Sequence, residues 1–146
     1  MKIRLIWVGK TKERFIVDGI NKYMRLLKPF AELGVTEVKE EKGTDIQRIK
    51  EKEGERIMRL QTPYVLLDEQ GKNLTSVEFA EFMDRYPHGI NFVTGGAYGV
   101  SDAVRSGAQT KIALSKMTFT HEMSRLFLLE QIYRGFTITR KRGYHH

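Results

Sequence analysis

The stretch FVTGGAYGVSDAV, residues 92–104, joins an apolar run to a short helical segment through a turn that contains three glycines. These glycines do not have the G-x-G-x-x-G spacing that binds dinucleotides, and no G-x-x-x-x-G-K-[ST] phosphate loop is present. Two interpretations remain open. Either the glycines only turn the chain where a Cβ is unfavourable, or they let the backbone lie against a ligand.

The same alternation of strand and helix continues through the whole chain. Apolar or alternating segments predict five strands, at residues 2–9, 34–40, 63–69, 90–94 and 111–115. Helices are predicted around residues 16–27, 44–60, 75–86, 101–107 and 120–136. Two of these helices begin with the pattern of a capping box, Thr44 with Gln47 and Thr75 with Glu78. The alternation predicts an α/β fold: an open, mostly parallel sheet covered by helices on both faces, in a single domain of residues 1–146.

The chain is basic at both ends and contains no cysteine. Its formal net charge is +7; residues 1–30 carry 8 basic and 2 acidic side chains, and residues 101–146 carry 8 and 3. Basic ends favour an RNA partner, with solvated surface lysines as the alternative. The lack of cysteine excludes disulfides and thiolate metal sites. No apolar run is long enough for a signal peptide or a membrane span, so we expect a soluble, cytoplasmic protein with no membrane partner.

Three segments are candidates for a ligand site. In open α/β sheets, ligands bind beyond the carboxyl ends of the strands. Residues 66–72, 94–99 and 114–125 follow three strands that we expect to be neighbours, and we interpret all three as loops. The third is rich in Ser, Lys, Met, Thr, Phe and His. This composition predicts a loop that wraps an apolar ligand and hydrogen-bonds the ligand's polar edge through backbone groups.

Several of these motifs also occur together in one known family. The motifs are GGAYG at residues 95–99, ALSKMTFTHEMSRLFLLEQIYRGFTI at 113–138, the terminal YHH, VGKTKE at 8–13 and IKEKEGERI at 49–57. Together they resemble the SPOUT methyltransferases, and specifically the RlmH family of 23S ribosomal RNA pseudouridine-N3 methyltransferases. The resemblance covers essentially the whole chain. It implies a C-terminal trefoil knot, one of the rare exceptions to unknotted topology, and a homodimer.

The resemblance also implies a reaction and its site residues. The reaction is the S-adenosylmethionine-dependent methylation of N3 of a pseudouridine in helix 69 of 23S rRNA, on the assembled 70S ribosome. The implied cofactor-binding positions are Leu67, Gly95, Gly96, Leu114, Ser115, Lys116, Met117, Thr118 and Phe119. Tyr144 and His145 correspond to a tail that reaches the target nucleotide. With this ligand, Gly95 and Gly96 are expected to let the backbone lie against the cofactor.

Two further residues are candidates for the chemistry itself. N3 of pseudouridine carries a proton that must leave as the methyl group arrives, so the site needs a base or a cation. His121 and Arg125 are four residues apart, which places them on one helix face, and we expect both at the mouth of the pocket. His121 could accept the proton and Arg125 could stabilise negative charge. The alternatives are a capping or core-edge histidine and an arginine in a subunit ion pair.

The C-terminal segment suggests how RNA is held. Arg140, Lys141 and Arg142 are expected to grip phosphates, and Tyr144 is expected to stack on a base. No metal site is predicted, because two adjacent histidines without a carboxylate are a weak signal. The preceding helix is apolar nearly all round, which fits either a core helix or a dimer interface. Two rival functions remain: a non-catalytic, basic RNA-binding α/β protein, and a flavodoxin-like mononucleotide binder.

Overall fold

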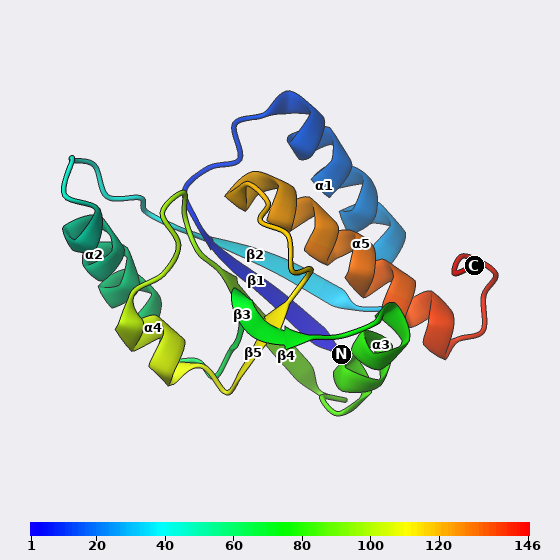
Figure 1. Cartoon of the computed structure of the whole chain (residues 1–146). Coiled ribbons are helices and arrows are strands. Elements are labelled where there is room, and N and C mark those ends of the chain that lie inside the picture. Colours follow the sequence, from blue (N-terminus) through cyan, green and yellow to red (C-terminus); the bar gives the residue numbers. More distant parts are fainter.

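The computed structural model describes residues 1–146 and contains one five-stranded parallel sheet with strand order β2-β1-β4-β3-β5 (Figure 1). The strands are β1 (Lys2–Val8), β2 (Glu32–Val38), β3 (Val65–Asn73), β4 (Gly89–Thr94) and β5 (Thr110–Ala113). The helices are α1 (Arg14–Leu27), α2 (Ile46–Met58), α3 (Ser76–Asp84), α4 (Asp102–Gly107) and α5 (His121–Thr139). The predicted α/β fold with a parallel sheet is confirmed. None of the helices combines the length and apolarity needed to cross a membrane.

Helices cover both faces of the sheet, as predicted. Helices α1, α3 and α5 lie on one face, and α2 and α4 lie on the other (Figure 1). The alternation of side chains in β1 supplies both layers: Ile3, Leu5 and Trp7 are buried in the larger core, while Ile6 and Val8 belong to the smaller one. Because both faces of its second half are buried, β1 is continuously apolar from Leu5 to Val8.

One of the two predicted capping boxes is confirmed. At the start of α3, the Thr75 side chain accepts a hydrogen bond from the Glu78 backbone N–H, and the Glu78 carboxylate accepts one from the Thr75 N–H. The box predicted at Thr44 is wrong. Helix α2 begins one residue later, and Asp45 is its N-cap, with its carboxylate accepting from the Arg48 N–H. Asp and Thr are both good N-cap residues, so local sequence did not distinguish the two positions.

The interpretation of residues 66–72 as a loop is wrong. They belong to β3, which pairs with β5 up to Leu67, loses register, and pairs again from Lys72. The four intervening residues therefore bulge out of the ladder. The bulge ends at Gly71, where an added Cβ would lie 2.7 Å from the backbone of β5. This close approach requires glycine and directs the side chains of Asp68, Glu69 and Gln70 to the carboxyl edge of the sheet.

Candidate functional site

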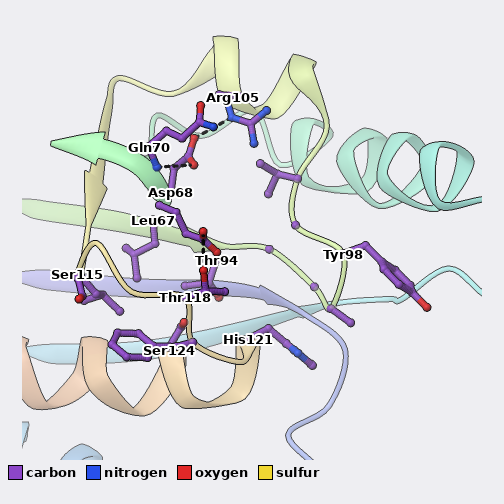
Figure 2. A pocket seen from close by; sticks show the side chains of 18 of the residues that line it. Leu67, Asp68, Gln70, Thr94, Tyr98, Arg105, Ser115, Thr118, His121 and Ser124 are labelled. Atoms are coloured by element: carbon purple, nitrogen blue, oxygen red, sulfur yellow. Dashed lines mark hydrogen bonds and ion pairs between the residues drawn. The ribbon is translucent and has the colours of Figure 1, made fainter. Parts of the chain in front are cut away.

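A cavity of about 450 Å³ opens at the carboxyl ends of β3, β4 and β5. Its walls are the bulge of β3, the glycine turn after β4, the segment between β5 and α5, and the first turn of α5 (Figure 2). The three segments singled out in the sequence thus meet at one site. Parallel strands place their following segments at the same edge of the sheet, which explains why residues far apart in sequence converge here.

Eight of the nine cofactor positions implied by the resemblance line this cavity. They are Leu67, Gly95, Gly96, Leu114, Ser115, Met117, Thr118 and Phe119. The ninth, Lys116, is an exposed residue outside the lining. His121 and Ser124, from the start of α5, complete the same wall.

The glycine turn is shaped mainly by contacts within the protein. A Cβ on Gly95 would lie 2.9 Å from the carbonyl carbon of Gly99, and a Cβ on Gly96 would lie 3.1 Å from Oε1 of the buried Glu53. Gly99 has a φ of 85° and donates its N–H to the Gly96 carbonyl at 3.1 Å. We expected the first two glycines to make room for a ligand. Both glycines line the cavity, and the nearest atoms to a Cβ at these positions are the protein's own, the Gly99 backbone for Gly95 and the Glu53 carboxylate for Gly96.

The segment between β5 and α5 is tied to the bulge and to α5. The Thr118 hydroxyl donates to Glu69 at 2.9 Å, and the Met117 N–H donates to the Ser115 hydroxyl at 3.0 Å. The Phe119 ring lies 4.8 Å, centroid to centroid, from that of Phe127 on α5. These contacts hold the segment over the cavity without filling it.

An ion pair borders the cavity on the side of α4. Arg105 Nε donates to Asp68 Oδ2 at 2.8 Å, and the Gln70 N–H donates to Oδ1 of the same carboxylate at 3.2 Å (Figure 2). Burial alone would raise the pKa of Asp68. The hydrogen bonds from Arg105 and Gln70 outweigh burial, so the pKa of Asp68 lies below its ordinary value. Asp68 is therefore charged at neutral pH and keeps the guanidinium at the rim.

His121 lies in the cavity wall, as predicted. Its side chain is half-buried. Burial is the main cause that lowers the pKa of His121 below its ordinary value, and the Arg125 cation lowers it further. The imidazole is therefore neutral at pH 7 and has a lone pair with which it can accept a proton.

Arg125 does not lie where the sequence predicted. Instead of reaching the mouth of the cavity, it is fully buried behind the cavity wall. Its guanidinium donates to the Val8 carbonyl at 2.6 Å and to the Thr11 hydroxyl at 2.9 Å, and lies over the Trp7 ring at 4.9 Å. Burial lowers the pKa of Arg125 to about 10, which leaves it positively charged at neutral pH.

The C-terminal tail turns back along the second half of α5, away from the cavity. The Tyr144 ring packs edge-on against Tyr133 at 4.8 Å, and its hydroxyl lies 3.2 Å from Glu130 Oε1. His145 Nδ1 lies 3.1 Å from Arg134 Nη1. The residues that the tail contacts, Glu130 to Arg134, follow His121 by 9 to 13 positions, which is about 14–20 Å along the helix axis. The structure thus does not bring Tyr144 and His145 to the cavity of their own chain.

The three predicted RNA-binding residues of the tail are exposed. The guanidinium groups of Arg140 and Arg142 lie over the Phe30 ring, at 5.4 and 5.3 Å from its centroid. Lys141 has a φ of 52°, which reverses the chain after α5. No group of three or more His, Asp or Glu side chains is arranged to hold a metal ion.

Sequence reasoning missed several residues that line the cavity. Asp68, Glu69 and Gln70 lie in the candidate segment 66–72 but were not named individually, and Arg105 of α4 lay outside all three candidate segments. Thr94 begins the candidate segment 94–99 but was likewise not named as a site residue. Its side chain lines the cavity and is 3% exposed, yet its hydroxyl has no hydrogen-bond partner in the protein. A buried, unpaired hydroxyl cannot be recognised from sequence.

Comparisons with known proteins place the chain in a family. A family model described as "Predicted SPOUT methyltransferase" matches residues 1–145. Among similar proteins, a ribosomal RNA large subunit methyltransferase H from Geotalea uraniireducens is 47% identical, with 100% of both chains covered. Another protein of this name, from Thermodesulfovibrio yellowstonii, is 43% identical over 99% of both chains.

Two solved structures share the fold at low sequence identity. A probable methylase family protein from Haemophilus influenzae Rd KW20 is 10% identical with a TM-score of 0.57, covering 99% of this chain and 70% of that chain. TrmJ from Z. mobilis ZM4 is 10% identical with a TM-score of 0.53, covering 92% and 70%. The sheet, the full-length family match and the relatives above 40% identity agree with the resemblance seen in the sequence, and the chain belongs to the SPOUT methyltransferases, in the family of the ribosomal RNA large subunit methyltransferases H.

Proposed function

We propose that this enzyme transfers the methyl group of S-adenosylmethionine to N3 of a pseudouridine in helix 69 of 23S rRNA, on the assembled 70S ribosome. The observation that carries the proposal is the meeting of eight implied cofactor positions in one cavity at the carboxyl edge of the sheet. The family name of the relatives supports an rRNA substrate. The choice of nucleotide and of its N3 atom rests on the resemblance to the RlmH family.

The cavity residues fit the proposed cofactor. The lining combines apolar groups such as Leu67, Leu114 and Phe119 with hydroxyl and carboxylate groups, which suits a ligand with both an apolar and a polar part. The unpaired Thr94 hydroxyl is a hydrogen-bonding group that a bound ligand can satisfy. When bound, S-adenosylmethionine supplies an electrophilic methyl group on a sulfonium. The protein's part is then to align the nucleotide and to remove one proton.

His121 is the proposed proton acceptor. It lines the cavity, and its lowered pKa keeps the imidazole neutral at pH 7. A neutral imidazole can take the imide proton either directly or through one water. Arg125 does not line the cavity, so it does not contact a substrate bound there. Its positive charge behind the wall still favours negative charge that develops in the cavity.

The site is proposed to be completed by a second subunit. Tyr144 and His145 are packed against Glu130, Tyr133 and Arg134 of α5 and do not line the cavity of their own chain, which favours a role for them at a partner's cavity. Apolar side chains at the cavity also support a packed neighbour, since Met117 is 73% exposed and Tyr98 is 53% exposed. In this homodimer, Arg140, Lys141 and Arg142 beside the tail would contact RNA phosphates.

The first test is a calorimetric titration of the purified protein with S-adenosylmethionine, with ATP and NAD as controls. Selective binding of S-adenosylmethionine is expected, because no lysine-bearing phosphate loop is present. The second test is methyl transfer to three substrates: 70S ribosomes, ribosomes with uridine in place of pseudouridine, and naked 23S rRNA. We expect methylation of the first alone. Absence of cofactor binding by the folded protein would refute the proposal and favour a non-catalytic RNA-binding role.

A further inference from the structure

Two buried charged residues in the first turns of α5 point away from the cavity. Glu122 is 8% exposed and Arg125 is 0% exposed, and they are three residues apart on the helix. Both reach the loop of residues 9–13, which joins β1 to α1. His121, adjacent in sequence to Glu122, faces the cavity. One side of the first turns of α5 therefore lines the cavity, and the other side is bonded to the loop of residues 9–13.

Four hydrogen bonds make this attachment. Glu122 Oε1 accepts from the backbone N–H groups of Lys12 and Glu13, both at 3.0 Å. Arg125 donates to the Thr11 hydroxyl at 2.9 Å and to the Val8 carbonyl at 2.6 Å. The Glu122 carboxylate therefore binds the end of the loop next to α1, and the Arg125 guanidinium binds the end next to β1. Bonds to charged groups are stronger than neutral ones, so the loop and the helix are firmly joined.

From this geometry we propose that Glu122 and Arg125 are positioning residues, which fix the first turn of α5 on the loop of residues 9–13 and thereby hold the His121 imidazole at the cavity. The inference rests on the proposed function, in which His121 accepts the proton. It changes the role expected for Arg125 from a group that contacts the substrate to one that acts through His121. Buried charges are an expensive way to join a helix to a loop, and the specific geometry that they impose fits a requirement for position.

The same two residues also set the charge around His121. The charged groups that act on its imidazole are Arg125 and Glu122 on α5, Lys12 in the attached loop, and Glu40 beyond β2. After burial, Arg125 is the strongest influence and lowers the pKa of His121, while Glu122 acts in the opposite direction. Removing the two charges one at a time must therefore move the pKa of His121 in opposite directions.

The test compares Arg125→Met and Glu122→Gln with wild type. Methionine keeps an unbranched apolar side chain over Trp7 but has no charge. Glutamine keeps an oxygen that can accept from the loop but has no charge. Proton NMR of the free protein follows the His121 titration, with the signal assigned by its absence in His121→Gln. We expect the pKa of His121 to rise in Arg125→Met and to fall in Glu122→Gln. A shift in the same direction in both variants, or no shift in either, would overturn the inference.

Position is tested separately from charge. Glu122→Ala removes the acceptor, so the amide protons of Lys12 and Glu13 should exchange with solvent faster. Its kcat for methyl transfer should fall by about 10- to 100-fold, with the affinity for S-adenosylmethionine little changed, because misplacement of a catalytic group mainly lowers kcat. Raising the pH should not restore this loss. Unchanged kcat in a folded Glu122→Ala protein with faster exchange would refute a positioning role.

Arg4→Met is the matched control. Arg4 is half-buried and, like Arg125, donates to a threonine hydroxyl, here Nε to Thr36 at 2.8 Å, but it lies near the amino end of β1, away from the cavity. The Arg4→Met substitution should change neither the pKa of His121 nor kcat. If Arg125→Met does not fold, the Glu122 variants carry the test alone. The NMR and exchange measurements need no RNA, so a failure of the proposed function, seen as wild type that does not methylate ribosomes, is distinguishable from a failure of this inference.

Discussion

Replacement of Thr94 by valine should stabilise the free protein and weaken its ligand binding. The Thr94 side chain is 3% exposed, and its hydroxyl has no partner in the protein. An unsatisfied buried polar group costs about 1–3 kcal/mol, and valine has the same shape without the hydroxyl. A gain of about 1 kcal/mol in unfolding free energy is expected for Thr94→Val, which raises Tm by about 2–4 °C for a chain of this size.

A bound ligand should reduce this gain in stability. If a bound molecule satisfies the Thr94 hydroxyl, the variant loses about 1 kcal/mol of binding free energy, and Kd for S-adenosylmethionine rises by about 5-fold. Thermal unfolding and calorimetric titration of the same samples measure both quantities. The variant should therefore melt higher than wild type without ligand, and the difference should shrink when ligand is added.

Thr137→Val is the control for this experiment. Thr137 is 1% exposed, but its hydroxyl donates to the Arg134 carbonyl at 2.7 Å. Removing a satisfied hydroxyl should cost about 0.5–1.5 kcal/mol, so the two threonine variants should have opposite effects on Tm. Equal destabilisation by both variants would refute the reasoning, and so would an unchanged Kd in Thr94→Val.

Three other perturbations test separate parts of the site. Gly71→Ala should lower the unfolding free energy by about 1–3 kcal/mol in denaturant titrations, because its Cβ would lie 2.7 Å from the β5 backbone. The pKa of Asp68 is lowered in the folded protein, so its ion pair with Arg105 stabilises the fold above the unfolded-state pKa, and this stability is lost as the pH falls through the folded-state pKa. Wild type should therefore lose Tm between about pH 5 and 2, and Asp68→Asn should lose less. Deletion of Tyr144 to His146 should leave cofactor binding intact and abolish methylation of ribosomes, and mixing this protein with His121→Ala should restore part of the activity in mixed dimers.

The sequence was sufficient to predict the parts of the fold that depend on periodicity. The apolar run of β1 and the Thr75 capping box both follow from local patterns, and both are found in the structure. The bulge in β3 was missed because Asp, Gly and Asn are common in loops, and only the pairing with β5 shows that the ladder resumes. A local pattern cannot show where a distant strand restores the register.

The placement of Arg125 could not be predicted for a related reason. Helical periodicity correctly put Arg125 and His121 on neighbouring parts of α5, but a long side chain can bend to either side of its backbone. Its direction was decided by two acceptors near the end of β1, the Val8 carbonyl and the Thr11 hydroxyl. These lie more than 100 positions away in sequence, and nothing local to α5 indicates them.

The distribution of unpaired polar atoms supports the proposed ligand site independently of the family resemblance. Three buried side-chain atoms have no hydrogen-bond partner: Trp7 Nε1, Thr94 Oγ1 and Arg125 Nε. They are not scattered, because Trp7 pairs with Thr94 in the sheet register and Arg125 lies over the Trp7 ring. Each such atom costs stability, and apolar side chains of similar size would avoid that cost. Violations of packing rules are expected at functional sites. These three residues lie at the carboxyl edge of the sheet, where Thr94 lines the cavity. These three groups lower stability at one place in the fold, and that place adjoins the cavity in which we propose that S-adenosylmethionine binds, so a ligand that reaches Thr94 would offset part of the cost.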